Sequence, residues 1–172
     1  MLNTFSIPII PDNDAERLHK LFSYNILDTT EEMSFSNITT VAAQMFKVPI
    51  ALVSLVDKER VWFKAKKGMG DAKEIARGVS LCSLAILKDE VTVFEDTKND
   101  PCLYANPLVA GSFGLRFYAA APLVTPDGYA IGAVCVAGKE PQEFSLADQD
   151  ILKNFASMVM EEIETRKLAE AL

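Results

Sequence analysis

The sequence contains 172 residues, of which 49% are hydrophobic and 24% charged, and its formal net charge at pH 7 is −7. This length allows one domain with a full core but not two, and the hydrophobic share excludes a disordered chain. The excess of acidic residues, with no cluster of Lys or Arg, argues against a nucleic-acid or anionic-membrane partner, because both are recognised by positive charge.

Neither a membrane span nor a secretory signal is predicted. No segment has the roughly 18 consecutive apolar residues that a span requires, and the N-terminal residues lack a basic region ahead of their short apolar run. The three cysteines, Cys82, Cys102 and Cys135, are odd in number and well separated. They are typical of reduced thiols rather than of a disulfide framework, so a cytoplasmic location is expected.

Two helices are predicted within residues 13–46. Asn13 precedes Glu16 by three residues, which is the spacing of a capping box at the start of a helix. Thr29 and Glu32 repeat this spacing ahead of the second helix. Apolar residues recur at intervals of three and four in both segments, as expected where one face of a helix is buried.

Two strands are predicted next. Residues 50–57 are almost entirely apolar and rich in β-branched side chains, which favours a buried strand. Residues 61–68 predict a strand nearer the edge of the sheet, protected from edge-to-edge pairing by the charges of Lys64 and its neighbouring lysines. Residues 69–79 show no periodicity and are predicted to form a loop.

A short helix, a third strand and an irregular lid follow. Ser80 is placed to cap the short helix, and residues 91–96 predict the strand. Residues 97–114 contain two prolines, two glycines and two asparagines, and we expect one or two helical turns there. So long a connection within a small domain is more often a lid or a pocket wall than slack chain.

Residues 116–137 predict an antiparallel hairpin. Two nearly uncharged runs flank a Pro-Asp-Gly turn, in which Gly128 accepts the positive φ that such hairpins need. Both runs are apolar on both faces, so they belong in the middle of a covered sheet. If Gly128 forms a bulge, Cys135 shares a face with Phe117; with a plain loop it shares a face with Tyr118.

Ser145, three residues before Asp148, predicts the start of a last helix. The order of elements is typical of an α+β domain with an antiparallel sheet. We expect helices from both ends of the chain on one face, and the short helix and lid on the other. The single domain, 1–172, is predicted to comprise an N-terminal segment 1–12, helices 13–46, a sheet 49–137 with its lid 97–115, and a C-terminal helix 145–172.

Five sequence blocks and the closing helix carry a resemblance to a known family. The blocks are, in order, ERLHKLFSYNILDT, PIALVSLVDKERVWFKA, SLCSLAI, NDPCLYANPLV and LRFYAAAPLVTPDGYAIGAVCV. Through them the chain resembles a GAF domain, most closely the N-terminal GAF sensor domains of bacterial diguanylate cyclases and sensor histidine kinases. The resemblance implies a five- or six-stranded antiparallel sheet, a ligand cavity beneath the lid, and dimerisation through the terminal helices.

The sequence departs from the family at one informative position. Members often carry a histidine two residues after the cysteine of the short helix, whereas this chain has Leu84 there. The only histidine, His19, lies in the first predicted helix and is expected to have a structural role. Haem, histidine-held metals and other cofactors are therefore not expected.

Nine residues, on three of the predicted strands, the short helix and the lid, are predicted to line the ligand site. They are Phe63, Cys82, Leu84, Phe94, Asp96, Tyr104, Asn106, Arg116 and Tyr118. Arg116 either binds a carboxylate or phosphate of the ligand or pairs with Asp96 or Asp100. Asn106 either closes over the ligand or makes a turn before Pro107.

Three functions are considered. The first is a non-enzymatic sensor that binds an unidentified small molecule between sheet and lid, dimerises through its terminal helices and signals to an effector domain or partner protein. The second is an enzyme resembling methionine sulfoxide reductases, with Cys82 and Cys102 as its reactive thiols. The third is a dimerisation module whose pocket is filled by its own side chains, with Leu84 and Phe113 as fillers.

Overall fold

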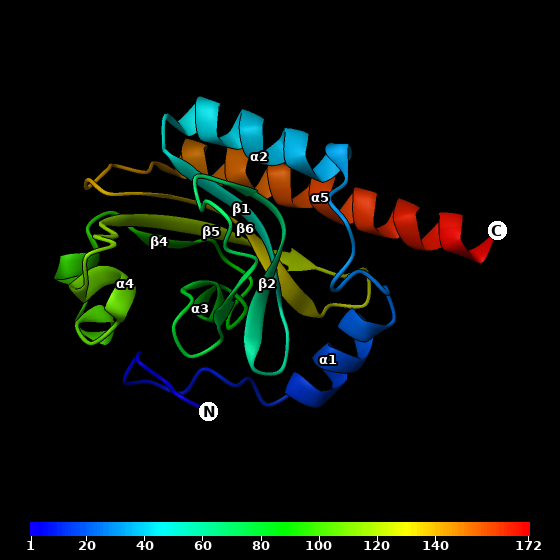
Figure 1. Ribbon diagram of the computed structural model, residues 1–172, viewed down its shortest axis with the longest axis horizontal. Helices are drawn as coiled ribbons and strands as arrows, with labels where there is room; N and C mark the ends of the chain where they lie inside the picture. The colour runs from blue at the N-terminus through cyan, green and yellow to red at the C-terminus, as the bar shows by residue number, and fades with distance from the viewer.

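A six-stranded antiparallel sheet forms the centre of the computed structural model, which describes residues 1–172 (Figure 1). The strands follow the order β3-β2-β1-β6-β5-β4. Their bounds are β1 Ile50–Val56, β2 Arg60–Lys67, β3 Glu74–Ala76, β4 Thr92–Phe94, β5 Phe117–Val124 and β6 Ala130–Gly138. The predicted α+β class and antiparallel sheet are confirmed.

Helices cover both faces of this sheet. Their bounds are α1 Asp14–Phe22, α2 Met33–Phe46, α3 Cys82–Ala85, α4 Pro107–Ala110 and α5 Leu146–Ala171. Helices α2 and α5 lie side by side on one face, and α3 and α4 lie on the other (Figure 1). Helix α1 packs near the start of β6, where Arg17 donates a hydrogen bond to the carbonyl oxygen of Val56. None of these helices combines the length and the hydropathy that a membrane span requires.

The sheet separates two apolar cores. We call the core under α2 and α5 the helix-side core, and the core under α3 and the lid the lid-side core. Neighbouring strand residues alternate between them, since successive side chains of a strand point to opposite faces. Trp62 lies in the helix-side core and Phe63 in the lid-side core, so these two neighbouring side chains of β2 point in opposite directions.

The central hairpin forms between β5 and β6 as predicted. Gly128 has a φ of +93°, and the thiol of Cys135 faces the lid side together with Tyr118, the face expected for a plain loop. The hairpin is nevertheless not regular, because its register shifts between Leu123 and Val124, which pair with Gly132 and Ala130. Gly132 lies where β1 approaches β6 so closely that a Cβ atom would stand 1.9 Å from the carbonyl oxygen of Ser54. A side chain at this position is therefore incompatible with the pairing of these two strands.

Helix α5 begins with the predicted capping box. Ser145 Oγ accepts a hydrogen bond from the backbone N–H of Asp148 at 3.1 Å, and Asp148 Oδ2 accepts one from the backbone N–H of Ser145 at 2.9 Å. The corresponding prediction at Asn13 is only partly right, because Asn13 is the N-cap of α1 but its side chain makes no capping hydrogen bond. The prediction at Thr29 is wrong, because α2 begins at Met33 and no side chain caps it. The side chain of Glu32, which the capping box required, instead binds Lys64 and Arg166.

The expectation of a charged edge at β2 is also wrong. A short strand, β3, forms within the segment predicted to be a loop, and it pairs with the outer side of β2. The side chain of Lys64 is fully buried, where it donates to Thr29 Oγ1 at 2.9 Å and to the carbonyl oxygen of Thr30 at 2.7 Å. Lys64 therefore ties the connection before α2 to the sheet.

Candidate functional site

A small cavity lies between the sheet and the lid, where the family resemblance places a ligand. It has a volume of about 30 Å³, which is room for one or two water molecules. Strands β1, β5 and β6 form its floor, and α3, α4 and the segments around them form its roof. Its thirteen lining residues, twelve of them hydrophobic, are Ile50, Leu52, Met69, Ile75, Ser80, Leu81, Cys82, Leu108, Phe113, Leu115, Tyr118, Cys135 and Ala137.

Two of the nine predicted site residues, Cys82 and Tyr118, line this cavity. Phe63 and Leu84 are buried in the lid-side core that surrounds it, and Phe94 packs against the same core. The structure thus brings these five residues together on one side of the sheet. The cavity also includes residues that no local sequence pattern marks, above all Cys135, whose face depends on the register of the hairpin.

Three polar side chains meet at the cavity floor. The hydroxyl group of Tyr118 donates to Cys82 Sγ at 3.1 Å, and the Sγ atoms of Cys82 and Cys135 lie 4.0 Å apart. The neighbouring thiol of Cys135 lowers the pKa of Cys82 and outweighs the effect of burial, while contact with Cys82 and burial raise the pKa of Cys135. Burial also raises the pKa of Tyr118.

Arg116 and Asp96 pair with each other, which realises the structural alternative for Arg116. The guanidinium donates through Nε and Nη2 to Asp96 Oδ1, both at 3.2 Å, and through Nη2 to Oδ2 at 3.1 Å. Hydrogen bonds from Arg116 and from the backbone N–H of Lys98 lower the pKa of Asp96. Neither side chain lines the cavity.

The two remaining predicted residues belong to the lid but do not face the cavity. Asn106 is fully buried; its Nδ2 donates to the carbonyl oxygen of Val79 at 2.8 Å and to Thr4 Oγ1 at 3.0 Å. Its Oδ1 caps α4 by accepting from the backbone N–H of Leu108 at 3.0 Å. Tyr104 is 60% exposed.

The N-terminal segment closes the lid side of the molecule. Phe5 and Ile9 are buried in the lid-side core, and the backbone N–H of Thr4 donates to the carbonyl oxygen of Gly78. A Cβ atom on Gly78 would stand 1.4 Å from the carbonyl oxygen of Leu2, so only glycine permits this crossing. The sequence signals this contact only through Ile7 to Pro11, an apolar segment that contains two prolines.

Cys102 is not part of the cavity. It is half-buried and lines a separate surface depression with Ile7, Leu87 and Phe94. Burial and the neighbouring carboxylate of Asp100 raise the pKa of Cys102 to about 11, which is the opposite of what a nucleophilic thiol needs. The structure therefore pairs Cys82 with Cys135 and separates it from Cys102.

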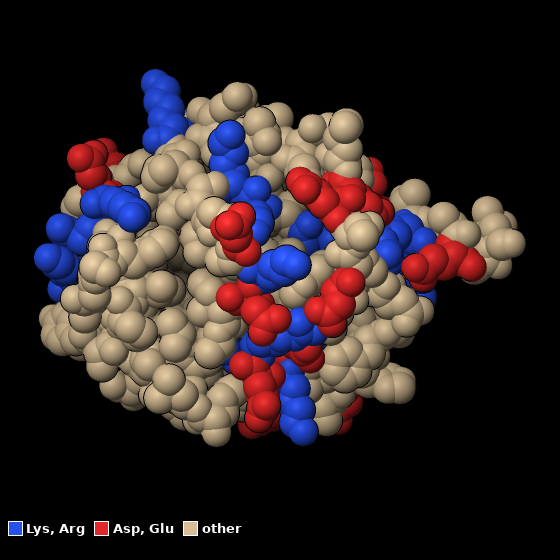
Figure 2. All heavy atoms as spheres, viewed as in Figure 1, with Lys and Arg blue, Asp and Glu red and all other residues tan.

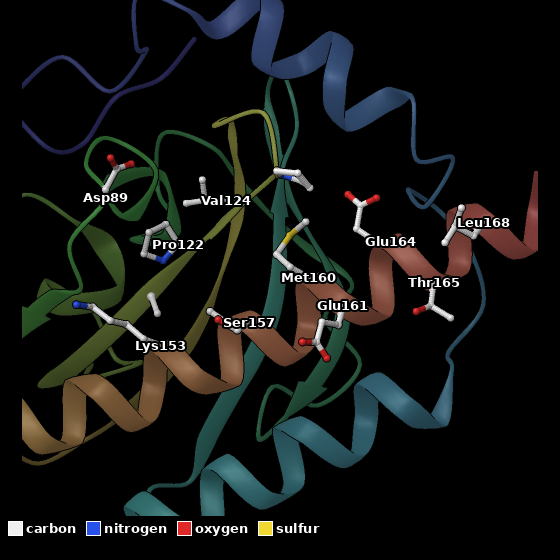
Figure 3. A pocket seen from close by; sticks show the side chains of 13 residues that line it. Asp89, Pro122, Val124, Lys153, Ser157, Met160, Glu161, Glu164, Thr165 and Leu168 are labelled. Carbon is white, nitrogen blue, oxygen red and sulfur yellow. The ribbon is translucent and has the colours of Figure 1, made fainter.

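The helix side of the sheet carries an open groove and an uncharged helix. A groove of about 790 Å³ runs between α5 and β5, and Figure 3 shows Met160 and Glu164 extending into it from α5. Helix α2 carries no charged residue along its whole length. Its exposed large side chains are Met33, Val41 and Met45. Basic and acidic side chains interleave instead near the middle of the view in Figure 2, below the position that α2 has in Figure 1.

The chain is similar to parts of two longer bacterial proteins. The chain is 36% identical over 160 residues to a cyclic di-GMP phosphodiesterase of Pseudomonas aeruginosa, covering 92% of this chain and 27% of that protein. It is 30% identical over 93 residues to a diguanylate cyclase of Escherichia coli, covering 54% of this chain and 26% of that protein. The chain thus spans about a quarter of the length of these relatives.

The fold has a close counterpart among solved structures. The GAF domain of an Acinetobacter phosphoenolpyruvate-protein phosphotransferase superposes with a TM-score of 0.66, at 18% sequence identity, over 90% of this chain and 94% of that domain. The sequence profile of the GAF domain family matches residues 30–163. The chain belongs to the GAF domain family.

Proposed function

We propose that this chain is a non-enzymatic sensory domain that binds a small, largely apolar molecule between the sheet and the lid and signals through its terminal helices to an effector domain. The observation that carries the proposal is the cavity itself, whose lining is apolar except for Ser80, the thiols and the Tyr118 hydroxyl. An apolar lining with a few convergent polar groups is the usual composition of a small-molecule site. The similarity to cyclic di-GMP signalling proteins supports the regulatory role.

Entry of a ligand requires movement of the roof. Met69, Ile75, Leu108 and Phe113 line the cavity and are only half-buried. Met69, Leu108 and Phe113 lie outside the strands of the sheet, whereas Ile75 lies in the short edge strand β3 and pairs with Val61 of β2. A ligand that favours the open arrangement of these side chains therefore shifts the lid toward it.

The sheet provides a short route from the cavity to α5. On β6, Cys135 and Ala137 face the cavity, while Val134 and Val136 belong to the helix-side core that α5 covers. A displacement of this strand by a ligand therefore acts on α5 directly, because a close-packed core transmits strain. A ligand changes the output only if it makes different contacts with the open and the closed arrangements of the lid.

A filled pocket is the second candidate, because the cavity holds only about 30 Å³. In this reading Phe113 and its neighbours occupy the space that a ligand would take, and the domain acts as a dimerisation module through α2 and α5. The uncharged outer face of α2, with Val41 and Met45 exposed, supports such a contact. Dimerisation is common to both candidates, so only ligand binding separates them.

The deciding experiment is a thermal-shift screen of small metabolites, followed by native mass spectrometry of every compound that raises the melting temperature. Binding in the cavity is expected to disappear in Ala137→Leu, because the added side chain extends into the space that Ala137 borders. Tyr104→Leu, on the exposed side of the lid, is the matched control and should bind normally. A screen without binders, or binders unaffected by Ala137→Leu, would favour the filled pocket.

A further inference from the structure

Cys82 and Cys135 are the only two thiols that the fold brings together, and they come from α3 in the roof and β6 in the floor of the cavity. Their Sγ atoms lie 4.0 Å apart, and each residue is 1% exposed. We propose that these two cysteines are an oxidation site, at which a small peroxide converts the thiol pair into an intramolecular disulfide. This inference does not depend on the identity, or the existence, of a metabolite ligand.

The distance suits this reaction. A disulfide requires the two sulfur atoms to approach to about 2.05 Å, so the gap must shorten by about 2 Å. Helix α3 is a single turn of four residues between two irregular segments, whereas β6 is held by hydrogen bonds to strands on both sides. We therefore expect Cys82 to move toward Cys135 rather than the reverse.

The surroundings assign different roles to the two sulfurs. Cys82 Sγ accepts the hydrogen bond from Tyr118, and Cys135 lies on its other side, so a thiolate at Cys82 is stabilised without any basic residue nearby. The lowered pKa of Cys82 and the raised pKa of Cys135 agree with this assignment. Because the thiolate is the nucleophile, Cys82 attacks first and Cys135 resolves.

The cavity admits only small oxidants to Cys82 and Cys135. Both cysteines line the cavity, which holds a molecule about as large as one or two waters. Hydrogen peroxide is of this size, whereas glutathione and organic disulfides are far too large. Burial therefore selects a small peroxide as the oxidant and protects the intermediate from larger thiols.

The reaction balances without any other co-reactant. The thiolate of Cys82 attacks one peroxide oxygen; an S–O bond forms, the O–O bond breaks, and the departing hydroxide becomes water by taking up a proton. Cys82 is now a sulfenic acid. The sulfur of Cys135 then attacks Cys82 Sγ, the S–S bond forms, the S–O bond breaks, and the proton of Cys135 leaves with the oxygen as water. The two thiols lose two electrons and the peroxide gains them.

The consequence is a covalent link between roof and floor. A disulfide from α3 to β6 prevents the roof from moving away from the sheet, which is the movement that entry of any ligand requires. It also acts on β6, the strand that contacts α5 on its opposite face. Oxidation is thus a second signal to which the domain responds, independent of a bound ligand.

The test is to treat the folded protein with hydrogen peroxide, block the remaining thiols with an alkylating agent and map the peptides without reduction. We expect a cross-linked pair of peptides containing Cys82 and Cys135, reversed by dithiothreitol, with Cys102 still alkylated. The oxidised protein should melt about 5 °C or more above the reduced protein, since a link across a long loop stabilises the fold. Mapping of the wild-type protein needs no variant to fold.

Three variants complete the experiment. Cys82→Ser and Cys135→Ser should each abolish the cross-link and the rise in melting temperature, whereas Cys102→Ser should keep both. The proposal is overturned if Cys82 and Cys135 both remain open to alkylation after unfolding, if they are oxidised separately to sulfinic acids, or if Cys102 is the partner in the cross-link.

Discussion

The guanidinium of Arg77 donates to both carboxylate oxygens of Asp14, at 2.9 and 2.7 Å, across the junction between α1 and the sheet. A second buried arginine, Arg17, donates to Asp14 Oδ1 at 2.9 Å. Both guanidinium groups are almost fully buried. One carboxylate therefore compensates two positive charges at the point where α1 docks. Nη1 of Arg77 also donates to the backbone carbonyl oxygens of Asp57 and Lys58, while its Nε has no hydrogen-bond partner.

Asp14→Asn should destabilise the protein by about 3–5 kcal/mol, because loss of the carboxylate leaves buried positive charge without compensation. Chemical denaturation with urea measures the change. Glu16→Gln is the matched control, since Glu16 is an exposed acid in the same first turn of α1 and should change stability by less than about 0.5 kcal/mol. Equal losses of stability in the two variants would show that the buried cluster of Asp14, Arg17 and Arg77 does not stabilise the protein.

Glu32 should make stability depend on pH. Burial raises its pKa, but hydrogen bonds from Lys64 and Arg166 outweigh burial and hold the pKa below its usual value. A lowered folded-state pKa means that this stabilisation is present above the ordinary glutamate pKa of about 4.3 and is lost as pH falls through the folded value.

Glu32→Gln should therefore be less stable than wild type at pH 7, and the difference should shrink steadily below about pH 4. Urea midpoints measured between pH 7 and pH 3 test this expectation. Glu31→Gln, at the exposed neighbouring position, serves as the control. A difference between wild type and Glu32→Gln that stays constant over this range would contradict the assignment.

Sequence patterns predict the hairpin and the last helix correctly because their signals are local. The turn at Gly128 and the capping box at Ser145 each depend on residues within a few positions of one another. The pattern at Thr29 and Glu32 is equally local, yet a long-range partner overrides it. Glu32 binds the buried Lys64, which lies in a strand that sequence alone places near a charged edge.

The candidate site is less predictable for the same physical reason. Alternation along a strand assigns a side chain to a face, but it does not identify the group across from it. Cys82 and Tyr118 are predicted to face a pocket and do line the cavity. Arg116 instead forms an ion pair with Asp96, which is the alternative to ligand binding. The pairing of Cys82 with Cys135 depends on the hairpin register, which a single bulge reverses.

Gly132→Ala should cost about 3 kcal/mol or more, because the new Cβ atom would clash with the backbone of β1. The contact would be 1.9 Å to the carbonyl oxygen of Ser54, a group that cannot turn away without breaking strand pairing. Gly138→Ala in the same strand is the control, since its Cβ atom would meet only Pro49 Cδ at 3.6 Å. Urea denaturation of both variants measures the contrast; comparable losses would contradict the close approach.

The protein should not reduce free methionine sulfoxide with dithiothreitol as electron donor. The predicted pair needs Cys82 and Cys102 within reach of each other, but Cys102 lies outside the cavity that contains Cys82. Cys135 does lie beside Cys82, but the cavity that these two thiols share holds only about 30 Å³, which is too small for methionine sulfoxide. Turnover is measured by chromatographic detection of methionine. Activity that disappears in both Cys82→Ser and Cys102→Ser would establish the reductase instead and refute a purely sensory role.

Val41→Glu should convert a dimer into a monomer if α2 and α5 form the contact between two copies. Val41 is 45% exposed on the uncharged face of α2, and a carboxylate there would be buried without a partner in the dimer. Sedimentation velocity of both proteins over a range of concentrations measures the change. Ile10→Glu, which adds the same charge at a 47% exposed residue of the N-terminal segment, should leave the dimer intact. A wild-type protein that is monomeric at all concentrations would refute dimerisation. A dimer that survives Val41→Glu would place the contact elsewhere on the molecule.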